Sequence, residues 1–460
     1  MVMNQGLNSK LLFLCMIVVV LFLACGSRNL EGQKLHCVLR QEDIVFDVTY
    51  RETADKEERE TVILGCVGDP YWLKGGVIEF NKSHSDCVII MEDYWQEDEE
   101  AAVQALYRKV LTGKGPDIIA FDSMHVEDIA FGKSGMVEDL NAYLEKSSVI
   151  HKEDIIEPLY DALEVDDKLY MLPTNFGIDA LITKEEWLNE DGGWDSEKML
   201  ALLEEHAGLE IYESQSEMLE AYALYGIAGQ KGDETDREVI KDYLQIARML
   251  PEWYDFPTDD LVKREGGALF QNIGIDSVED YMCQTSFWGE DSAVVGYPEI
   301  KGNGMAFYPV NCFAISTKSK QKDNAWKFIE SFFEESGEEH NASPDEMYFS
   351  ICKDGLEEQF TKAMKREYYA NGEGGKEELP IQTYYLGEEL EEIYAAREED
   401  IAKIKDMIQG IRVIRRQEDS LVNILLEEAS VYFSGDKSLE EVTDIIESRL
   451  KLLWEERQDD

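Results

Sequence analysis

The sequence has few positive charges for its length. Its 460 residues contain 44 Lys and Arg against 97 Asp and Glu, which gives a formal net charge of −53 at pH 7. A nucleic-acid or anionic-membrane partner requires a basic surface, so this balance argues against both. With 44% hydrophobic residues the chain can still bury large cores, and the acidity is expected to keep the protein soluble and to repel neighbouring molecules.

The motifs of the commonest enzyme classes are missing. There is no phosphate-binding glycine loop, no G-x-S-x-G nucleophile elbow and no H-E-x-x-H zinc motif. The six histidines are scattered and never pair at helical spacing. Carboxylate pairs are abundant by chance in such an acidic chain, so they do not indicate a glycosidase. These absences favour binding over catalysis, and we expect no cofactor and no catalytic metal, while a structural calcium ion stays open.

Cysteine usage shows no metal or disulfide signature. Six cysteines lie beyond the N-terminal segment; none forms a C-x-x-C pair or stands beside a histidine at ligand spacing. Two of the six, Cys66 and Cys87, lie in apolar runs of strand length, where a free cysteine behaves as a small buried hydrophobe. Disulfides remain an open alternative for all six, the others being Cys37, Cys283, Cys312 and Cys352.

The longest apolar run is at the N-terminus. Lys10 precedes the apolar residues 11–23, and Ala24 stands immediately before Cys25. This pattern is typical of a secretory signal that ends at a lipoprotein cleavage site, which predicts removal of residues 1–24 and lipidation of Cys25. The mature protein is then expected on the outer face of the cell membrane, at a Gram-positive surface. An uncleaved anchor helix is the alternative, although the run falls short of the roughly 20 apolar residues that span a bilayer.

Beyond a polar segment at residues 26–60, apolar runs of strand length alternate with helical periodicity. Strands are predicted at residues 62–67, 87–91 and 117–121, with helices ending near residue 81 and covering about 98–111. This alternation predicts an α/β fold with a parallel sheet that binds ligands at the carboxyl ends of its strands. Further strands are predicted near residues 168–173, 178–183, 293–297 and 306–308, and helices over 196–250, past 323 and after the capping box of Ser438 and Glu441.

Three segments in succession resemble a known family. Residues 114–119, 133–140 and 167–173 are similar, in sequence and order, to the extracellular solute-binding proteins of family 1. These are the substrate-capturing subunits of carbohydrate-type ABC importers, such as the maltose-binding type. Residues 80–81, 266–269 and 314–329 extend the resemblance, which covers roughly residues 61–450.

The resemblance implies a two-lobed fold of the periplasmic-binding-protein type with a helical C-terminus. Hinge strands would cross between the lobes near residues 174–179 and 305–311, with a third crossing at the glycine-rich residues 372–375. The expected division is a signal peptide at 1–24, a lipid-anchored tether at 25–60, a first lobe formed by 61–175 plus 308–372, and a second lobe formed by 176–307 plus 376–455.

A neutral polyol needs aromatic platforms together with carboxylates and amides. Loops after the first three predicted strands and residues around the crossings supply such side chains. In relatives of the maltose-binding type, an acidic residue in the place of Asp122 contributes to sugar binding. The predicted ligand-binding residues are Asp69, Tyr71, Trp72, Tyr94, Trp95 and Asp122 in the first lobe, Asn175, Phe176 and Asp179 at the first crossing, and Trp253, Tyr254, Trp288 and Tyr297 in the second lobe.

Each predicted ligand-binding residue has a structural alternative. The aromatic side chains can instead pack in the core, and Asp122 can cap a helix. Sugar-binding members commonly carry a tryptophan soon after the segment that corresponds to residues 266–269, but residues 271–276 contain none. Either Trp288 supplies that platform, or the ligand is not a sugar.

The expected function is capture of a small solute, an oligosaccharide, between the two lobes. Ligand shifts an open–closed equilibrium, and the closed form delivers the solute to the permease subunits of an ABC importer without chemical change. The protein is expected to act as a lipid-anchored monomer with no nucleic-acid partner. The alternatives are a sensor that docks on a membrane receptor, a secreted glycan hydrolase and an acidic surface adhesin.

Overall fold

Contacts divide the chain of the computed structural model into two units, residues 1–59 and residues 60–460. In the first unit, only the short antiparallel strands β1 (Val38–Leu39) and β2 (Ile44–Val45) are described besides Arg59. The predicted signal peptide, Cys25 and Cys37 lie outside the described residues. The structure describes residues 38–39, 44–45, 59–67, 71–95, 99–121, 135–190, 192–228, 236–254, 261–334, 347–370, 375–386, 389–416 and 418–459.

The second unit begins with the predicted alternation of strands and helices. Strand β3 (Glu60–Cys66) pairs in parallel with β4 (Cys87–Asp93) and with β5 (Ile118–Phe121). Helix α2 (Tyr71–Ser83) connects the first two strands, and α3 (Glu99–Leu111) precedes the third. The three predicted strands and both helices are therefore confirmed, and their ends shift by a few residues at most.

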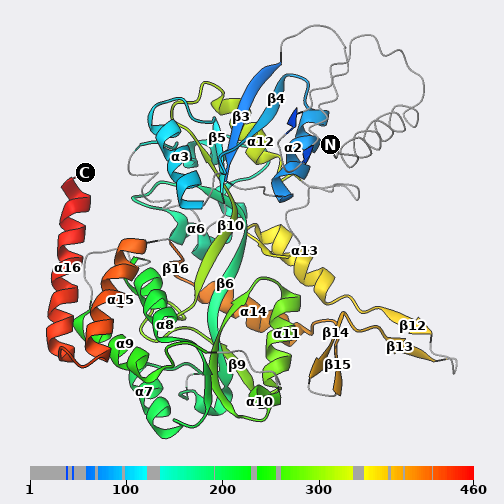
Figure 1. Ribbon diagram of the computed structural model, residues 1–460. Coiled ribbons are helices and arrows are strands. Elements are labelled where there is room, and N and C mark those ends of the chain that lie inside the picture. The colour runs from blue at the N-terminus through cyan, green and yellow to red at the C-terminus, as the bar shows by residue number, and fades with distance from the viewer. Residues whose placement is uncertain are drawn as a thin grey trace, which may run out of the picture. The chain divides into compact units, whose positions relative to one another are not determined.

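Two long strands, β6 (Leu172–Lys184) and β10 (Ala306–Ile315), lie side by side at the centre of the sheet (Figure 1). The strand order is β4-β3-β5-β10-β6-β8-β7, in which β8 is Ala268–Ile275 and β7 is Glu210–Tyr212. Strand β10 is antiparallel to both β5 and β6, so the sheet is mixed. The predicted parallel pairing holds for β3, β4 and β5, and β7 also pairs in parallel with β8. The two strands predicted near residues 168–173 and 178–183 correspond to the single strand β6, because the intervening residues are also extended and buried.

The pairing of these two strands is interrupted at Asn311. Val310 lies opposite Asn175 and Cys312 opposite Pro173, while Asn311 between them has a left-handed backbone with a φ of 56°. Asparagine tolerates this conformation better than most residues with a Cβ. Its side-chain N–H donates to the side-chain oxygen (Oδ1) of Asn175 at 3.4 Å, and the Thr174 hydroxyl donates to the same oxygen at 2.7 Å. Buried amide contacts thus hold the two strands together at this irregular point.

The other half of the sheet contains two elements that the sequence interpretation missed. Strand β7 (Glu210–Tyr212) interrupts the predicted helical region, which contains α7 (Ser196–Glu205), α8 (Gln215–Ala221) and α9 (Arg237–Met249). Residues 266–269 lead into strand β8 (Ala268–Ile275), for which no strand was predicted and most of whose residues are buried. A π-helix, η3 (Tyr222–Ala228), continues from α8, and β9 (Ser292–Val295) pairs with β6.

The prediction that helices dominate after residue 323 is wrong for residues 368–393. Two antiparallel hairpins, β12 (Tyr368–Ala370) with β13 (Lys376–Glu378) and β14 (Gln382–Leu386) with β15 (Glu389–Ile393), form there. The tyrosines in β12 and β14 favour extended pairing, as aromatic residues generally do. Of the glycine-rich residues 372–375, only Gly375 is described. Helices on either side are α12 (Lys322–Glu330), α13 (Lys353–Ala363) and α14 (Glu398–Gly410).

The remaining elements are short or terminal. They are α5 (Asn141–Leu144), η1 (Lys152–Asp154), α6 (Glu157–Leu163), η2 (Glu185–Trp187), α10 (Leu261–Arg264), α11 (Val278–Trp288), β11 (Phe349–Ser350), β16 (Val413–Ile414), α15 (Asp419–Phe433) and α16 (Leu439–Asp459). No helix in the described ranges is long and apolar enough to span a membrane.

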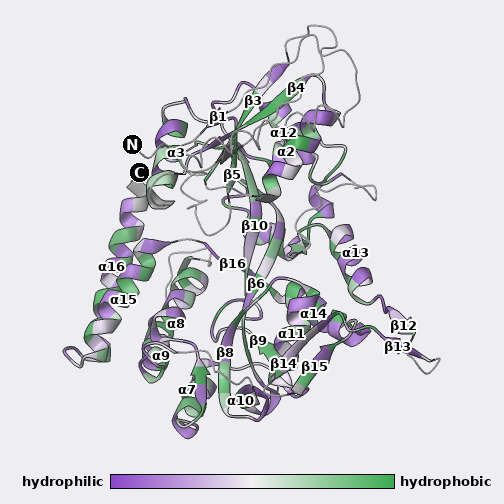
Figure 2. Ribbon diagram, turned by 45° about the vertical axis from the view of Figure 1, so that its right-hand side comes forward, coloured by the Kyte–Doolittle hydropathy of each residue, from purple (hydrophilic) through white to green (hydrophobic). Residues whose placement is uncertain are grey.

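Buried side chains form two hydrophobic clusters within the second unit. The larger cluster surrounds β3 to β6 and includes Cys66 and Cys87, which confirms that these cysteines are small buried hydrophobes. None of the five cysteines in the described residues forms a disulfide. The smaller cluster joins α7, α8, α9 and the two C-terminal helices. Along α15 and α16, apolar and hydrophilic residues share the same helix (Figure 2), and Val442, Ile446 and Leu450 of α16 are buried.

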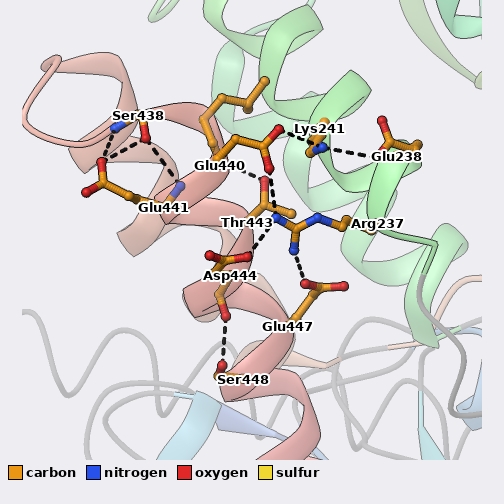
Figure 3. A network of polar contacts seen from close by, with 11 residues as sticks. Arg237, Glu238, Lys241, Ser438, Glu440, Glu441, Thr443, Asp444, Glu447 and Ser448 are labelled. Carbon is orange, nitrogen blue, oxygen red and sulfur yellow. Dashed lines mark hydrogen bonds and ion pairs between the residues drawn. The ribbon is translucent and has the colours of Figure 1, made fainter.

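Helix α16 begins at the predicted capping box and is held to α9 by ion pairs (Figure 3). The backbone N–H of Ser438 donates to the Glu441 carboxylate at 2.9 Å, and the Glu441 N–H donates to the Ser438 hydroxyl at 3.3 Å, which confirms the box. The Arg237 guanidinium lies 2.9 Å from Glu440 and 2.7 Å from Asp444, and it also pairs with Glu447.

Arg237→Ala is expected to loosen α16 without unfolding the protein. The substitution removes the cation that three carboxylates of α16 share, but such exposed pairs contribute little to global stability. Hydrogen exchange should therefore become faster in α16, while the melting temperature stays close to that of the parent protein. The matched control is Arg108→Ala, an exposed arginine on α3. Equal exchange rates for α16 in the parent protein and in R237A would contradict this prediction.

Candidate functional site

Asp179 lies on the polar face of the central strand β6. Side chains alternate along a strand, so Asn175, Gly177 and Asp179 share one face, while Phe176 and Ile178 point into the larger hydrophobic cluster. The Asp179 carboxylate accepts a hydrogen bond from the Tyr225 hydroxyl at 2.5 Å and lies 3.3 Å from the Arg415 guanidinium. Burial raises the pKa of Asp179, and Arg415 opposes the shift.

The two partners of Asp179 come from elements far apart in the sequence. Tyr225 is carried by the π-helix η3, a rare geometry that is frequent at functional sites. Arg415 directly follows β16, which pairs in parallel with the first residues of β10. The backbone N–H of Arg415 donates to the backbone carbonyl of Phe307 at 2.7 Å, so β10 fixes the position of the arginine backbone. The guanidinium also lies 3.8 Å from Glu220.

Glu213 is a completely buried carboxylate at the carboxyl end of β7. It directly precedes Ser214, the N-cap of α8, whose hydroxyl and backbone N–H form a capping box with Glu217. Glu213 is 0% exposed, and among the described residues neither carboxylate oxygen has a hydrogen-bond partner. Loss of hydration raises its pKa well above the usual range, Glu217 raises it further, and the Asn272 amide acts in the opposite direction. A buried polar group without a partner is costly and calls for an explanation.

A second acidic group, Asp276, lies beside Gly177 and Tyr308. Tyr308 is paired with Gly177 across the β6–β10 ladder, and its hydroxyl donates to the Asp276 carboxylate. A Cβ atom on Gly177 would lie 2.3 Å from the Tyr308 ring and 2.5 Å from an Asp276 oxygen. Glycine at position 177 therefore allows Tyr308 and Asp276 to meet over the strand.

Gly177→Ala is expected to separate Tyr308 from Asp276 and to lower the free energy of unfolding by roughly 1 kcal/mol, because added atoms overpack a filled space. Chemical denaturation measures this change. The matched control is Gly208→Ala, since nothing lies within 4 Å of a Cβ atom at that position. The prediction is wrong if both variants unfold at the same denaturant concentration as the parent protein.

We call these residues the Asp179 cluster: the carboxylates of Asp179, Glu213, Glu217, Glu220 and Asp276, the guanidinium of Arg415, and the neutral side chains of Tyr225, Tyr254, Asn272, Tyr297 and Tyr308. Burial is the largest cause of a raised pKa for Glu220 and for Asp276. Among the described residues, no three or more His, Cys, Asp or Glu side chains are placed to hold a metal ion. The cluster therefore offers hydrogen-bond acceptors and aromatic rings.

Three of the predicted ligand-binding residues meet in the Asp179 cluster. Asp179 is at its centre, and the Tyr254 hydroxyl lies 3.3 Å from the Glu217 carboxylate. Tyr297 is buried, and its ring packs edge-to-face on that of Tyr225 with 5.7 Å between the centroids. Their assignment to a ligand stays a prediction, but their spatial proximity is a property of the fold.

The other described residues of the predicted set lie apart from the cluster. Asn175, Phe176 and Trp288 are completely buried, and Tyr94 is nearly so, which fits the packing alternative for these side chains. Trp288 also has a structural role at its carbonyl, which accepts a hydrogen bond from the buried Lys184 ammonium at 2.5 Å. The exposed members are Trp95, 50% exposed after β4, and Trp253, 68% exposed after α9.

The side chains of four predicted ligand-binding residues are not described by the structure. Asp69 and Asp122 lie outside the described residues altogether. Tyr71 and Trp72 form the first residues of α2, but the positions of their side chains are not described. The loops after β3 and β5, where the sequence places two of the carboxylates, therefore stay predictions.

Sequence reasoning missed most of the cluster, although two signals were available. Glu213 stands at the carboxyl end of a strand, where ligands commonly bind in α/β sheets. The sequence pattern predicted a helix over this region, so β7 and its carboxyl end were missed. Arg415 belongs to a run of three arginines within residues 412–416, which is unusual in so acidic a chain. Tyr225 and Glu220 carried no signal, because an apolar or mixed helical pattern does not reveal which side chain faces a buried carboxylate.

The model of the bacterial extracellular solute-binding protein family matches residues 77–363, more than half of the chain. The chain therefore belongs to this family, whose description places its members outside the cytoplasm. The mixed sheet and its surrounding helices match the two-lobed fold of solute-binding proteins. A search of curated proteins finds no match.

Solved structures of similar fold share little sequence with this chain. An extracellular solute-binding protein family 1 member from Alicyclobacillus acidocaldarius is 14% identical, covers 87% of this chain and 100% of its own, and has a TM-score of 0.52. The sugar-binding protein MalE from Xanthomonas citri is 14% identical over 86% of this chain and 98% of its own, with a TM-score of 0.55. A de novo designed cysteine esterase is 12% identical over 86% of this chain and 100% of its own, with a TM-score of 0.56. These similarities define the fold.

Proposed function

We propose that this protein captures an oligosaccharide between its two lobes and delivers it unchanged to the permease of an ABC importer. Membership of the solute-binding family supports the binding role, and the MalE protein of similar fold is named as sugar-binding. The observation that carries the proposal is the Asp179 cluster. It joins side chains from β6, η3 and the residue after β16, and it combines carboxylates, an amide and tyrosine rings.

The cluster suits a polyol because its members differ in exposure. Glu213 is fully buried, whereas the side chain of Asp179 is 14% exposed, that of Arg415 30% and that of Glu220 43%. A solute that contacts the outer members could therefore exchange hydrogen bonds with groups that are already oriented by the fold. We propose that Asp179, Tyr254 and Tyr297 contact the solute, together with Trp95 and Asp122 from the first lobe.

We also propose the division into lobes given by the resemblance, with 61–175 plus 308–372 in the first lobe and 176–307 plus 376–455 in the second. Residues 1–24 would be a signal peptide, and lipid on Cys25 would hold the mature monomer to the outer face of the membrane through residues 25–60. Loss of the protein from the membrane fraction in a Cys25→Ala strain would support this anchoring, and unchanged fractionation would contradict it.

Binding is tested by a thermal-shift and tryptophan-fluorescence screen of the purified protein against an oligosaccharide library. We expect saturable quenching and a raised melting temperature with at least one compound, because a ligand bound only by the native state stabilises it. Tyr254→Phe should weaken binding roughly tenfold by removing one half-buried hydrogen-bond donor. The control is Tyr385→Phe on an exposed hairpin. Release of cleaved product during incubation would instead indicate a hydrolase.

A further inference from the structure

Within the described residues, no group meets either carboxylate oxygen of Glu213 in hydrogen-bonding geometry, and the Asn272 amide is the donor that comes nearest to doing so. Besides burial, the largest influences on the pKa of Glu213 come from Glu217 and Glu220 on α8, Asp179 on β6 and Asn272 on β8. Three of these four are carboxylates, and they repel a second negative charge. The side-chain oxygen of Asn272 accepts a hydrogen bond from the Tyr254 hydroxyl at 3.4 Å, so only the side-chain NH2 group of Asn272 can donate to Glu213.

The only cation that contacts the carboxylates of the cluster, within the described residues, is Arg415. Its guanidinium is divided between Asp179 and Glu220, at 3.3 and 3.8 Å. Arg415 is not among the largest influences on the pKa of Glu213. Asp276 is likewise satisfied by a neutral group, the Tyr308 hydroxyl, rather than by a positive charge. The cluster as a whole therefore carries more negative than positive groups, and its most buried member is the least satisfied.

We propose that the solute of this protein carries a protonated amine that binds at Glu213, so that its ligand is an amino sugar rather than a neutral or acidic one. This inference rests on the proposed function. A buried carboxylate is retained at low cost only where a cation or a set of donors meets it. An ammonium group supplies both a positive charge and three N–H donors.

Solutes with carboxylate or phosphate groups are disfavoured by the same arrangement. An anion brought to the cluster would meet Glu213, Glu217 and Glu220 with only Arg415 to offset them. Like charges at close range in a buried site cost several kcal/mol in comparable interfaces, which is a common source of specificity. Selection would thus operate on the charge of one ring substituent.

The experiment uses matched disaccharides that differ in one substituent. Cellobiose, its diamino analogue (β-1,4-linked glucosamine dimer), the corresponding di-N-acetyl compound and cellobiouronic acid are titrated at pH 6.5, and the galacto- and manno-configured sets follow in the same way. We expect the amine to bind at least tenfold more tightly than the neutral sugar of the same configuration, and the acid to bind most weakly. Tryptophan fluorescence and calorimetry give the affinities.

Glu213→Gln separates charge recognition from ordinary hydrogen bonding. This variant should lose at least tenfold more affinity for the amine than for the neutral sugar of the same configuration, because only the ammonium group needs the negative charge that glutamine lacks. The control is Glu197→Gln, which removes an exposed charge on α7. Equal affinity for amine and neutral sugars, or preference for the acid, would overturn the amine inference while the proposed function stands. If no sugar of any set binds, the proposed function fails and the inference falls with it.

Discussion

Replacing Arg415 with methionine is expected to lower the free energy of unfolding by about 3 kcal/mol, as for other ion pairs broken in partly buried positions. The guanidinium lies 3.3 Å from Asp179, whose side chain is only 14% exposed, and 3.8 Å from Glu220. Methionine fills similar space but leaves both carboxylates without a cation. Urea denaturation at pH 7 measures the loss.

Two companion variants identify the origin of this loss. Arg412→Met removes a neighbouring exposed arginine that donates to the carbonyls of Gln409 and Ile411, and it should change stability by less than about 0.5 kcal/mol. Asp179→Asn combined with Arg415→Met should recover most of the loss, because a neutral amide does not need the guanidinium. If the double variant is as unstable as Arg415→Met alone, packing rather than charge explains the effect.

Replacing Glu213 with glutamine is expected to raise the stability of the ligand-free protein by about 2 kcal/mol at pH 7, because the variant no longer has to hold a negative charge in a buried site among other carboxylates. Glutamine has nearly the same shape and no charge. Protein without ligand should therefore melt at a higher temperature in the variant, although the same change is expected to weaken amine binding. Such a gain in stability at a functional position is common.

The gain from Glu213→Gln should depend on pH in a defined direction. Burial, reinforced by Glu217, raises the pKa of Glu213 in the folded state above its unfolded value, while Asn272 opposes the shift and Asp179 and Glu220 add to it. The folded state then binds more protons, so stability falls as the pH rises from the unfolded pKa, near 4.3, through the raised folded pKa. The advantage of the variant should be small near pH 4 and largest at neutral pH. A constant difference across this range would contradict the assignment, and Glu197→Gln is the control.

The elements that could be predicted from the sequence are those with a strong local pattern. Strand β5 and helix α3 combine clean periodicity with a glycine stop, and the box at Ser438 fixes the start of α16. Strand β7 was missed because three residues between helices carry too little pattern. The hairpins from β12 to β15 were missed because their tyrosines stand in adjacent pairs, at 368–369 and 384–385, so no two-residue alternation marks a buried face.

The site was less predictable than the fold because its residues are brought together by long-range pairing. Asp179 could be selected for its place at a strand crossing, but Arg415 reaches it only through the pairing of β16 with β10. Glu213 lies 34 residues after Asp179 in the sequence. Its distinguishing feature, the lack of a hydrogen-bond partner among the described residues, is visible only in the folded structure. Two aromatic residues were assigned to the site although they are packed inside the protein. Trp288 and Phe176 have side chains that could stack on a sugar ring, but both are completely buried.

The attachment of α16 to α9 also determines how the protein responds to ionic strength. The contacts of Arg237 with Glu440 and Asp444 lie near the surface and are screened as salt is added, since the Debye length falls to about 3 Å at 1 M. The burial of Val442, Ile446 and Leu450 does not weaken under those conditions. The C-terminal helix should therefore stay docked in a saline medium, with its orientation governed by side-chain packing instead of charge.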